Sequence, residues 1–339
     1  FFNKQFLYRG EFRQRRQGRL SGTLGFWGMT RGFKSQGAEA LSPPVDQNAF
    51  ALFALEELDF EHFRLQFGGR VETNQYGPQR GLPSRGFTGL SASTGINVPL
   101  WFGGAFVANY THSYRAPALE ELYFNGPHVG NLTFELGNAN LKGELGNGVD
   151  LSLRHQSPRF KGETNVYYYR LSNFIYLAPT GEVEDGLRQA EYGQRTARFT
   201  GAELKGSLSL HEKAWINLSL DMVQASIRDA QAWTPLPRIT PLRGRFGLDF
   251  RHKGLSVRPE LMLANRQDRI FSTETATAGY AVPSLNASYS IAGPHTLHVF
   301  SLNLFNITNQ LYRNHLSFIK DLAPEIGRGV RFSYNLHFY

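Results

Sequence analysis

One histidine in the middle of the chain lies among carboxylates and aromatic residues, in a stretch with no regular pattern. His128 follows Gly126-Pro127, with Glu121 and Tyr123 shortly before it and Glu135 shortly after it. Imidazole nitrogen and carboxylate oxygen are zinc ligands, and these side chains could converge on one ion. We therefore predict that Glu121, Tyr123, His128 and Glu135 bind a ligand, with His128 as the metal ligand.

The other histidines have simpler explanations. The chain holds ten, and His211, His252 and His295 lie in expected tight turns. His315, in the last long connection, is a weaker second candidate for a metal ligand. His128 also has a plain alternative interpretation, as a loop histidine without a special role.

Catalytic patterns are missing from the sequence. Serine, histidine and aspartate are scattered over different predicted strands, and no Gly-x-Ser-x-Gly or His-Glu-x-x-His motif occurs. Glu120 and Glu121 are adjacent, so in an extended chain they would point to opposite sides. The chain has no cysteine, which excludes disulfides and thiolate metal sites. We predict that the protein is not an enzyme and has no resident cofactor, zinc being a candidate transported ligand.

Composition favours one large sheet. Of 339 residues 14% are aromatic and 35 are glycine, and no apolar run reaches the roughly 18 residues of a transmembrane helix. Mean hydropathy is −0.35, a value that membrane barrels also give because apolar and polar residues alternate along their strands. The net charge of +8 is spread over many segments without a basic run interleaved with stacking aromatics, so we expect no nucleic-acid partner.

Most of the chain alternates apolar and polar residues with the period of two that a β-strand imposes. On this pattern Leu218 lies on an apolar face and Ser219 on a polar one. The segment 49–58 is apolar on both faces, and the segment 164–177 is rich in aromatic residues, so its two faces are ambiguous. The pattern predicts about fifteen strands, most of them ten or more residues long.

The connections alternate between long and short. The short ones are expected at 99–103, 156–160, 211–213, 252–254 and 292–295, and the long ones at 111–140, 178–197, 228–241, 267–279 and 310–328. One rim of tight turns and one of long loops is typical of outer-membrane barrels. Charged side chains on the polar face are then expected to pair across strands in a wet lumen.

Several stretches resemble TonB-dependent outer-membrane receptors. The longest is Ser113-Tyr-Arg-Ala-Pro-Ala-Leu-Glu-Glu-Leu-Tyr123 with Asn131-Leu-Thr-Phe-Glu-Leu-Gly-Asn138, where a strand of that family rises into a large outer loop. Further similar stretches are 201–206, 235–245, 304–317 and 323–328, and the aromatic end at 330–339 resembles the terminal strand of outer-membrane barrels. The loop around His128 is similar to that of zinc-uptake receptors, with Asn125 where their first histidine stands.

The resemblance implies an all-β, antiparallel transmembrane barrel of 22 strands with a plug inside. Residues 1–339 are then expected to be the C-terminal portion of that barrel, with the plug and the first strands absent from this chain. The implied function is high-affinity uptake of a scarce nutrient, such as zinc, an iron chelate, haem or cobalamin, through the outer membrane of a Gram-negative bacterium. Its partners would be outer-membrane lipid, the small ligand and, through the missing N-terminal part, the TonB energy-coupling complex. Two alternatives remain open: a passive porin-like channel, which conducts ions without a plug, and a soluble all-β binding or adhesion protein, which folds without detergent.

Overall fold

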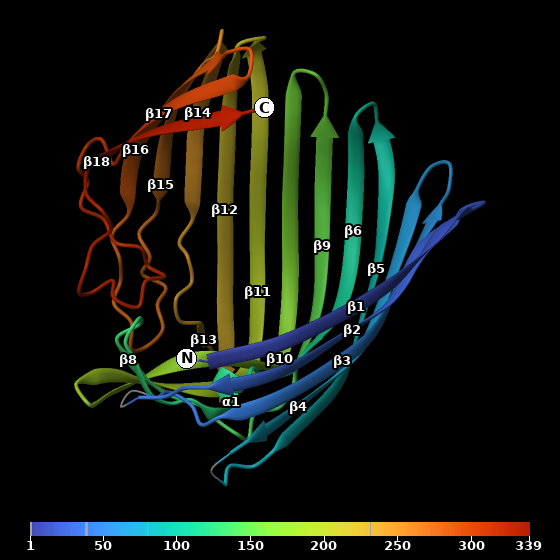
Figure 1. The fold of residues 1–339 in the computed structure, drawn as a ribbon, viewed down its shortest axis with the longest axis vertical. Coiled ribbons are helices and arrows are strands. Elements are labelled where there is room, and N and C mark those ends of the chain that lie inside the picture. The colour runs from blue at the N-terminus through green and yellow to red at the C-terminus, as the bar shows by residue number, and fades with distance from the viewer. Residues whose placement is uncertain (1, 38–39, 80, 231) are drawn as a thin grey trace.

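Residues 2–37, 40–79, 81–230 and 232–339 are described by a computed structural model, and most of them belong to one curved sheet (Figure 1). It has eighteen strands, three of which have only four residues. The prediction of about fifteen strands is confirmed for the fifteen longer ones, and the three short strands are not predicted by the alternation. The long strands are β1 (Phe2–Gln17), β2 (Leu20–Lys34), β3 (Val45–Asp59), β4 (Arg64–Pro78), β5 (Arg85–Trp101), β6 (Gly104–Arg115), β9 (Glu144–Gln156), β10 (Phe160–Glu184), β11 (Leu187–His211), β12 (Ala214–Asp229), β14 (Arg243–His252), β15 (Leu255–Ala264), β16 (Tyr280–Ala292), β17 (Thr296–Phe305) and β18 (Gly329–Phe338). The short elements are α1 (Leu119–Tyr123), β7 (Asn125–His128), β8 (Thr133–Leu136) and β13 (Ala232–Pro235).

Each long strand pairs antiparallel with the long strand before and after it in the chain. Strand β6 pairs directly with β9, and β12 with β14, so the short elements between them are side branches of the sheet. Among the described residues β1 pairs only with β2, and β18 only with β17. The predicted antiparallel all-β sheet is therefore confirmed, but in this chain it is open and does not close into a cylinder.

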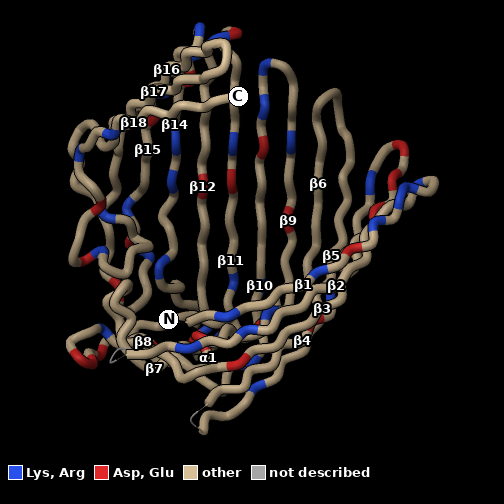
Figure 2. Tube along the Cα trace, in the orientation of Figure 1, with Lys and Arg blue, Asp and Glu red and all other residues tan. Residues whose placement is uncertain are grey.

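The two faces of the sheet differ in polarity as the alternation predicts. Leu218 stands opposite Gly206 on one side and Phe246 on the other, and both Leu218 and Phe246 are exposed, at 39% and 42%. On the opposite face Asp221 stands between Glu203 and Arg243 and forms an ion pair with Arg243 at 2.9 Å. Charged residues recur along the strands in Figure 2. An apolar face without a protein partner on nearly every strand is what a lipid-facing surface requires.

Short turns and long connections lie at opposite rims. The short rim comprises the turns after β1, β3, β5, β9, β11, β14 and β16. At the other rim, the predicted long loop over 178–197 is wrong, because β10 and β11 run through it and pair as far as Glu184 and Leu187. The hairpin turns at Asp185-Gly186, where both residues have positive φ, at 50° and 77°, as a two-residue hairpin turn requires.

The packed core lies at the long rim, where the connection 116–143 folds over the polar face. Helix α1 buries Leu119, Leu122 and Tyr123, at positions i, i+3 and i+4, against strand residues of that face. Tyr76 of β4 helps to fix it by donating to the Pro117 carbonyl at 2.7 Å. No helix among the described residues is long and apolar enough to cross a bilayer.

Candidate functional site

A small hairpin brings His128 and Glu135 together. Strand β7 ends at His128, the chain turns, and β8 places Thr133 opposite His128 and Glu135 opposite Gly126. Strand β8 also pairs in parallel with β11, with Glu135 opposite Ala190. The loop that carries the predicted metal ligand is thus hydrogen-bonded into the long β10–β11 hairpin.

Glu135 is a buried carboxylate that accepts several hydrogen bonds. Its residue exposure is 1%. Oε1 lies 2.8 Å from His128 Nδ1 and accepts from Asn131 Nδ2 and Thr133 Oγ1, each at 3.0 Å, while the Tyr192 hydroxyl lies 3.5 Å from Oε2. A buried carboxylate needs such partners to stay charged. Glu135 Oε1 therefore holds the histidine ring in place, while Oε2 has only the long contact with Tyr192.

The contact with Glu135 fixes which nitrogen of His128 carries the proton. A carboxylate oxygen only accepts, so we assign Nδ1 as the donor at 2.8 Å; the Asn131 amide, 3.0 Å from Nδ1, then donates to Glu135 Oε1 instead. In the neutral ring Nε2 then bears the free lone pair. The His128 side chain is 38% exposed, and in the described part of the chain Nε2 has no hydrogen-bond partner. A carboxylate that orients the remote nitrogen of a histidine is the usual support for a metal-binding imidazole.

The structure places the other two predicted ligand residues, Glu121 and Tyr123, in supporting contacts. Glu121 Oε2 accepts from the Ala118 backbone N–H at 2.8 Å and pairs with Arg115 at 2.9 Å, so it fixes the first turn of α1. Tyr123 is buried and donates to the Pro83 carbonyl at 3.0 Å. The expectation that Glu120 and Glu121 lie in an extended chain is wrong, because both are helical.

A cavity of about 480 Å³ opens beside His128 at the long rim. Its polar lining comprises Glu120, His128, Asn131, Glu135, Tyr192 and Arg238. Its apolar lining comprises Phe33, Leu41, Phe124, Leu177 and Phe318. These residues come from five different connections and hairpins, so the cavity exists only when the long-rim connections pack together. A cavity in which aromatic and aliphatic side chains stand beside converging polar groups is typical of a small-molecule site.

Arg238 is a site residue that the sequence pattern did not reveal. It lies between β13 and β14, and its guanidinium stacks on the Phe318 ring at 4.0 Å from the centroid. Its backbone has a positive φ of 55°, and its N–H donates to Glu274 Oε1 at 2.8 Å. The partners lie 36 and 80 residues away, so only the unusual Pro235-Leu-Pro-Arg238 run marks the position.

His315, the second metal candidate, is enclosed by polar groups near this cavity. Its Nδ1 lies 3.0 Å from Thr277 Oγ1 and 3.2 Å from Lys320 Nζ, while Nε2 is 4.0 Å from Glu274 Oε2. Lys320 is itself buried and donates to the Thr275 carbonyl at 2.9 Å. A neighbouring ammonium repels a metal ion. No group of three metal-ligating side chains is found among the residues that the structure describes.

The packing around His315 predicts that the stability of the loop over residues 310–328 depends on pH. Burial, and then the charge of Lys320, lower the pKa of His315, against the opposing charges of Glu274 and Asp321. Below about pH 6.5 the opened loop therefore binds a proton that the packed loop resists. Packing should weaken as pH falls, by at most about 1.4 kcal/mol per pH unit. Hydrogen exchange of residues 310–328 between pH 8 and 5 measures this.

Two variants check the assignment to His315. His315→Gln should flatten the pH dependence of exchange, whereas His295→Gln, an exposed residue at the short rim, should leave it unchanged. A His315→Gln loop that still loosens on acidification contradicts the assignment.

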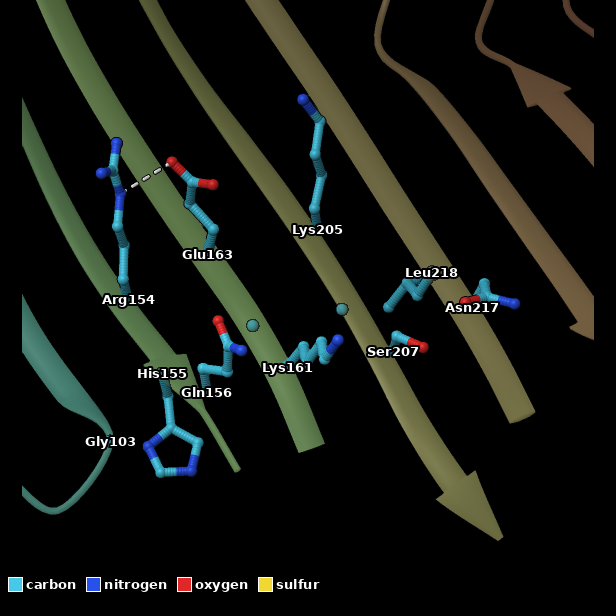
Figure 3. Close-up of a pocket in the computed structure, with 12 residues that line it drawn as sticks. Gly103, Arg154, His155, Gln156, Lys161, Glu163, Lys205, Ser207, Asn217 and Leu218 are labelled. Carbon is cyan, nitrogen blue, oxygen red and sulfur yellow. Dashed lines mark hydrogen bonds and ion pairs between the residues drawn. The ribbon is translucent and has the colours of Figure 1, made fainter. Parts of the chain in front are cut away.

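A second hollow, also of about 480 Å³, lies near the short rim. Figure 3 shows side chains from β9, β10, β11 and β12 along it, with Arg154 of β9 paired to Glu163 of β10 at 3.0 Å. Lys161 and Lys205 add positive charge. The ion pair is the cross-strand pairing expected for the polar face, and it supplies no further metal ligand set.

The sequence also matches a family model, that of the β-barrel of TonB-dependent receptor-like proteins, over residues 2–309. The chain belongs to the TonB-dependent receptor family. This agrees with the antiparallel sheet, the apolar outer face and the rim of long connections, and TonB-dependent receptors are transporters rather than enzymes.

Solved receptor structures share the fold. The copper transporter OprC superposes with a TM-score of 0.82 at 18% identity, over 99% of this chain and 56% of that protein. The FrpB iron transporter of Neisseria meningitidis (F3-3 variant) gives 0.75 at 14% identity, over 97% and 54%. The Serratia marcescens hemophore receptor HasR, in complex with HasA and heme, gives 0.72 at 16%, over 99% and 59%. The receptor chain described here thus spans a little over half the length of these proteins.

Proposed function

We propose that the full-length protein is an outer-membrane receptor that takes up a scarce, metal-bearing nutrient with energy supplied through TonB. The family supports this, and so do three structural neighbours named for copper transport, iron transport and hemophore binding. The exposed apolar face supports a location in the outer membrane of a Gram-negative bacterium. Its partners are then lipid, the ligand and the TonB complex.

The observation that carries the ligand proposal is the free Nε2 of His128. Its ring is fixed by a 2.8 Å contact to a buried carboxylate and lines a cavity of about 480 Å³. Imidazole nitrogen binds zinc well, and copper and iron also accept it. One histidine cannot complete a zinc site, and the described residues hold no group of three metal-ligating side chains. We therefore expect the remaining ligands to come from the metal's own chelator or from other parts of the full-length receptor.

The two alternative functions account for less. A soluble binding protein does not explain leucine and phenylalanine exposed along the outer face of neighbouring strands, such as Leu218, Leu220 and Phe246. A passive channel does not require a buried carboxylate to orient a histidine within a partly aromatic cavity at one rim. The receptor proposal explains both features.

The direct test is His128→Ala in the full-length receptor. We expect zinc binding and zinc-dependent growth to weaken at least about tenfold, because one of a few metal ligands is lost. His62→Ala, an exposed histidine at the short rim, is the control and should behave as wild type.

Two variants distinguish the hypothesis that zinc is the ligand from the hypothesis that the protein is an uptake receptor. If His128→Ala leaves zinc uptake unchanged while deletion of residues 125–136 abolishes uptake of an organic iron chelate, zinc is the wrong ligand and receptor function stands. If neither change affects the uptake of any nutrient, the cavity is not the ligand site.

A further inference from the structure

The guanidinium of Arg238 lines two cavities and has few hydrogen-bond partners among the described residues. It lines the cavity beside His128 and also a second one of about 290 Å³, and Phe318 lines both. A guanidinium has five N–H donors. For Arg238 the only side-chain hydrogen bond in the described residues is a long one, from Nη2 to the Leu177 carbonyl at 3.4 Å.

The carboxylates nearest to this guanidinium are already occupied. Glu274 uses Oε1 to accept the backbone N–H of Arg238 at 2.8 Å and Oε2 to accept that of Phe271 at 3.1 Å. Glu135 Oε1 accepts from His128, Asn131 and Thr133, and Oε2 lies 3.5 Å from the Tyr192 hydroxyl. Among the described residues no carboxylate lies within 4.0 Å of the Arg238 guanidinium.

Arg238 keeps its position although its backbone conformation is strained and its charge is partly buried. Its backbone adopts the left-handed region, which side chains other than glycine rarely occupy. The Phe318 ring supports one face of the guanidinium at 4.0 Å. Burial lowers the pKa of Arg238, with Glu274 and Glu135 opposing the shift. A half-buried cation that is stacked, strained and unpaired is poised to bind an anion, because desolvation strengthens such a pair.

We infer that Arg238 and Phe318 form an anion-binding subsite, and that the ligand is a metal complex with a net negative charge rather than a bare cation. This inference rests on the proposed function, in which His128 binds the metal. The guanidinium fork suits a carboxylate or another group with two oxygens. A bare divalent ion in the same cavity meets the repulsion of Arg238. The attraction of the two lining carboxylates is reduced, because Glu120 is paired with Arg31 at 3.4 Å and Glu135 accepts hydrogen bonds from three donors.

The test compares two zinc complexes of opposite charge in the full-length receptor. Zinc nitrilotriacetate is anionic and zinc tris(2-aminoethyl)amine is cationic, yet both are compact tripods that leave zinc open to an imidazole. By titration calorimetry we expect wild type to prefer the anionic complex at least about tenfold. Arg238→Gln should remove this preference by weakening the anionic complex alone. Arg159→Gln, which changes an exposed arginine between β9 and β10 at the short rim, should retain it.

His128→Ala separates the two proposals, because it should weaken both complexes. If it does so while Arg238→Gln changes neither, the metal site stands and the anion subsite is wrong. If Arg238→Gln acts and His128→Ala does not, the anion subsite stands and His128 is not the metal ligand. A wild-type receptor that fails to bind the anionic complex, or prefers the cationic one, overturns the inference. Arg238→Lys, which keeps the charge, should retain part of the preference, so a folding defect of Arg238→Gln cannot be mistaken for support.

Discussion

Arginine at Leu218 should block assembly of the barrel, whereas arginine at Asn217, the preceding residue, should be tolerated. Leu218 lies near the middle of the apolar run of β12, with Phe246 opposite it on β14. A charge there enters hydrocarbon and costs about 2–4 kcal/mol at the bilayer midplane. Asn217 lies on the polar face between Ser207 and Gly247, two small residues that leave room for the longer side chain.

The readout is the folded fraction after insertion into lipid vesicles, scored by resistance to dissociation in detergent and by protease protection. Asn217 is a better control than Ser219, which stands between Lys205 and Arg245, where an added arginine meets two like charges. Equal folded yields for Leu218→Arg and Asn217→Arg, or the reverse order, would show that the two faces are assigned the wrong way round.

Removal of the Glu135 carboxylate should release the hairpin that carries His128. Glu135→Ala leaves the donors on His128, Asn131 and Thr133 without their common acceptor. The loss of a buried acceptor costs about 1–3 kcal/mol. That amounts to roughly five- to a hundredfold in the equilibrium between the closed and open hairpin. Hydrogen exchange of residues 125–136 should accelerate to that extent.

The control for this loss is Glu120→Ala. Glu120 lines the same cavity, but its side chain is 34% exposed and makes a single 3.4 Å contact with Arg31. Such a pair is worth less than about 1 kcal/mol, so exchange should barely change. If Glu135→Ala leaves the hairpin as protected as in wild type, Glu135 does not position His128.

The sheet could be predicted because a bilayer constrains every residue of a crossing strand. Each strand must place apolar side chains on the face toward lipid. The alternation around Leu218 and Asp221 follows from this requirement. Beyond the bilayer both faces of a strand can be polar, so the constraint is lost. The extension of β10 and β11 through Glu184 and Leu187 therefore has a composition rich in glycine and acidic residues, which the sequence pattern does not distinguish from a loop.

The site could be predicted only in part. His128 and Glu135 fall seven residues apart in one connection, so their proximity was a reasonable expectation. Their separate roles could not be predicted, because sequence spacing does not show that three donors converge on one carboxylate oxygen. Glu121 and Tyr123 had the right chemistry, but in the structure they cap and pack helix α1. The Arg238 guanidinium stacks on Phe318, 80 residues further along the chain, and no local sequence pattern predicts such a contact.

The parallel pairing of β8 with β11 decides which wall of the cavity can move. Four residue pairs, from Thr133 with Arg188 to Leu136 with Glu191, tie β8 to the main sheet. A displacement of this wall would have to break that ladder. Arg238 and Phe318 belong instead to connections outside long strands, and side-chain contacts join them to the rest. We therefore expect the ligand to arrive and depart on their side of the cavity, with His128 as the stationary end of its path.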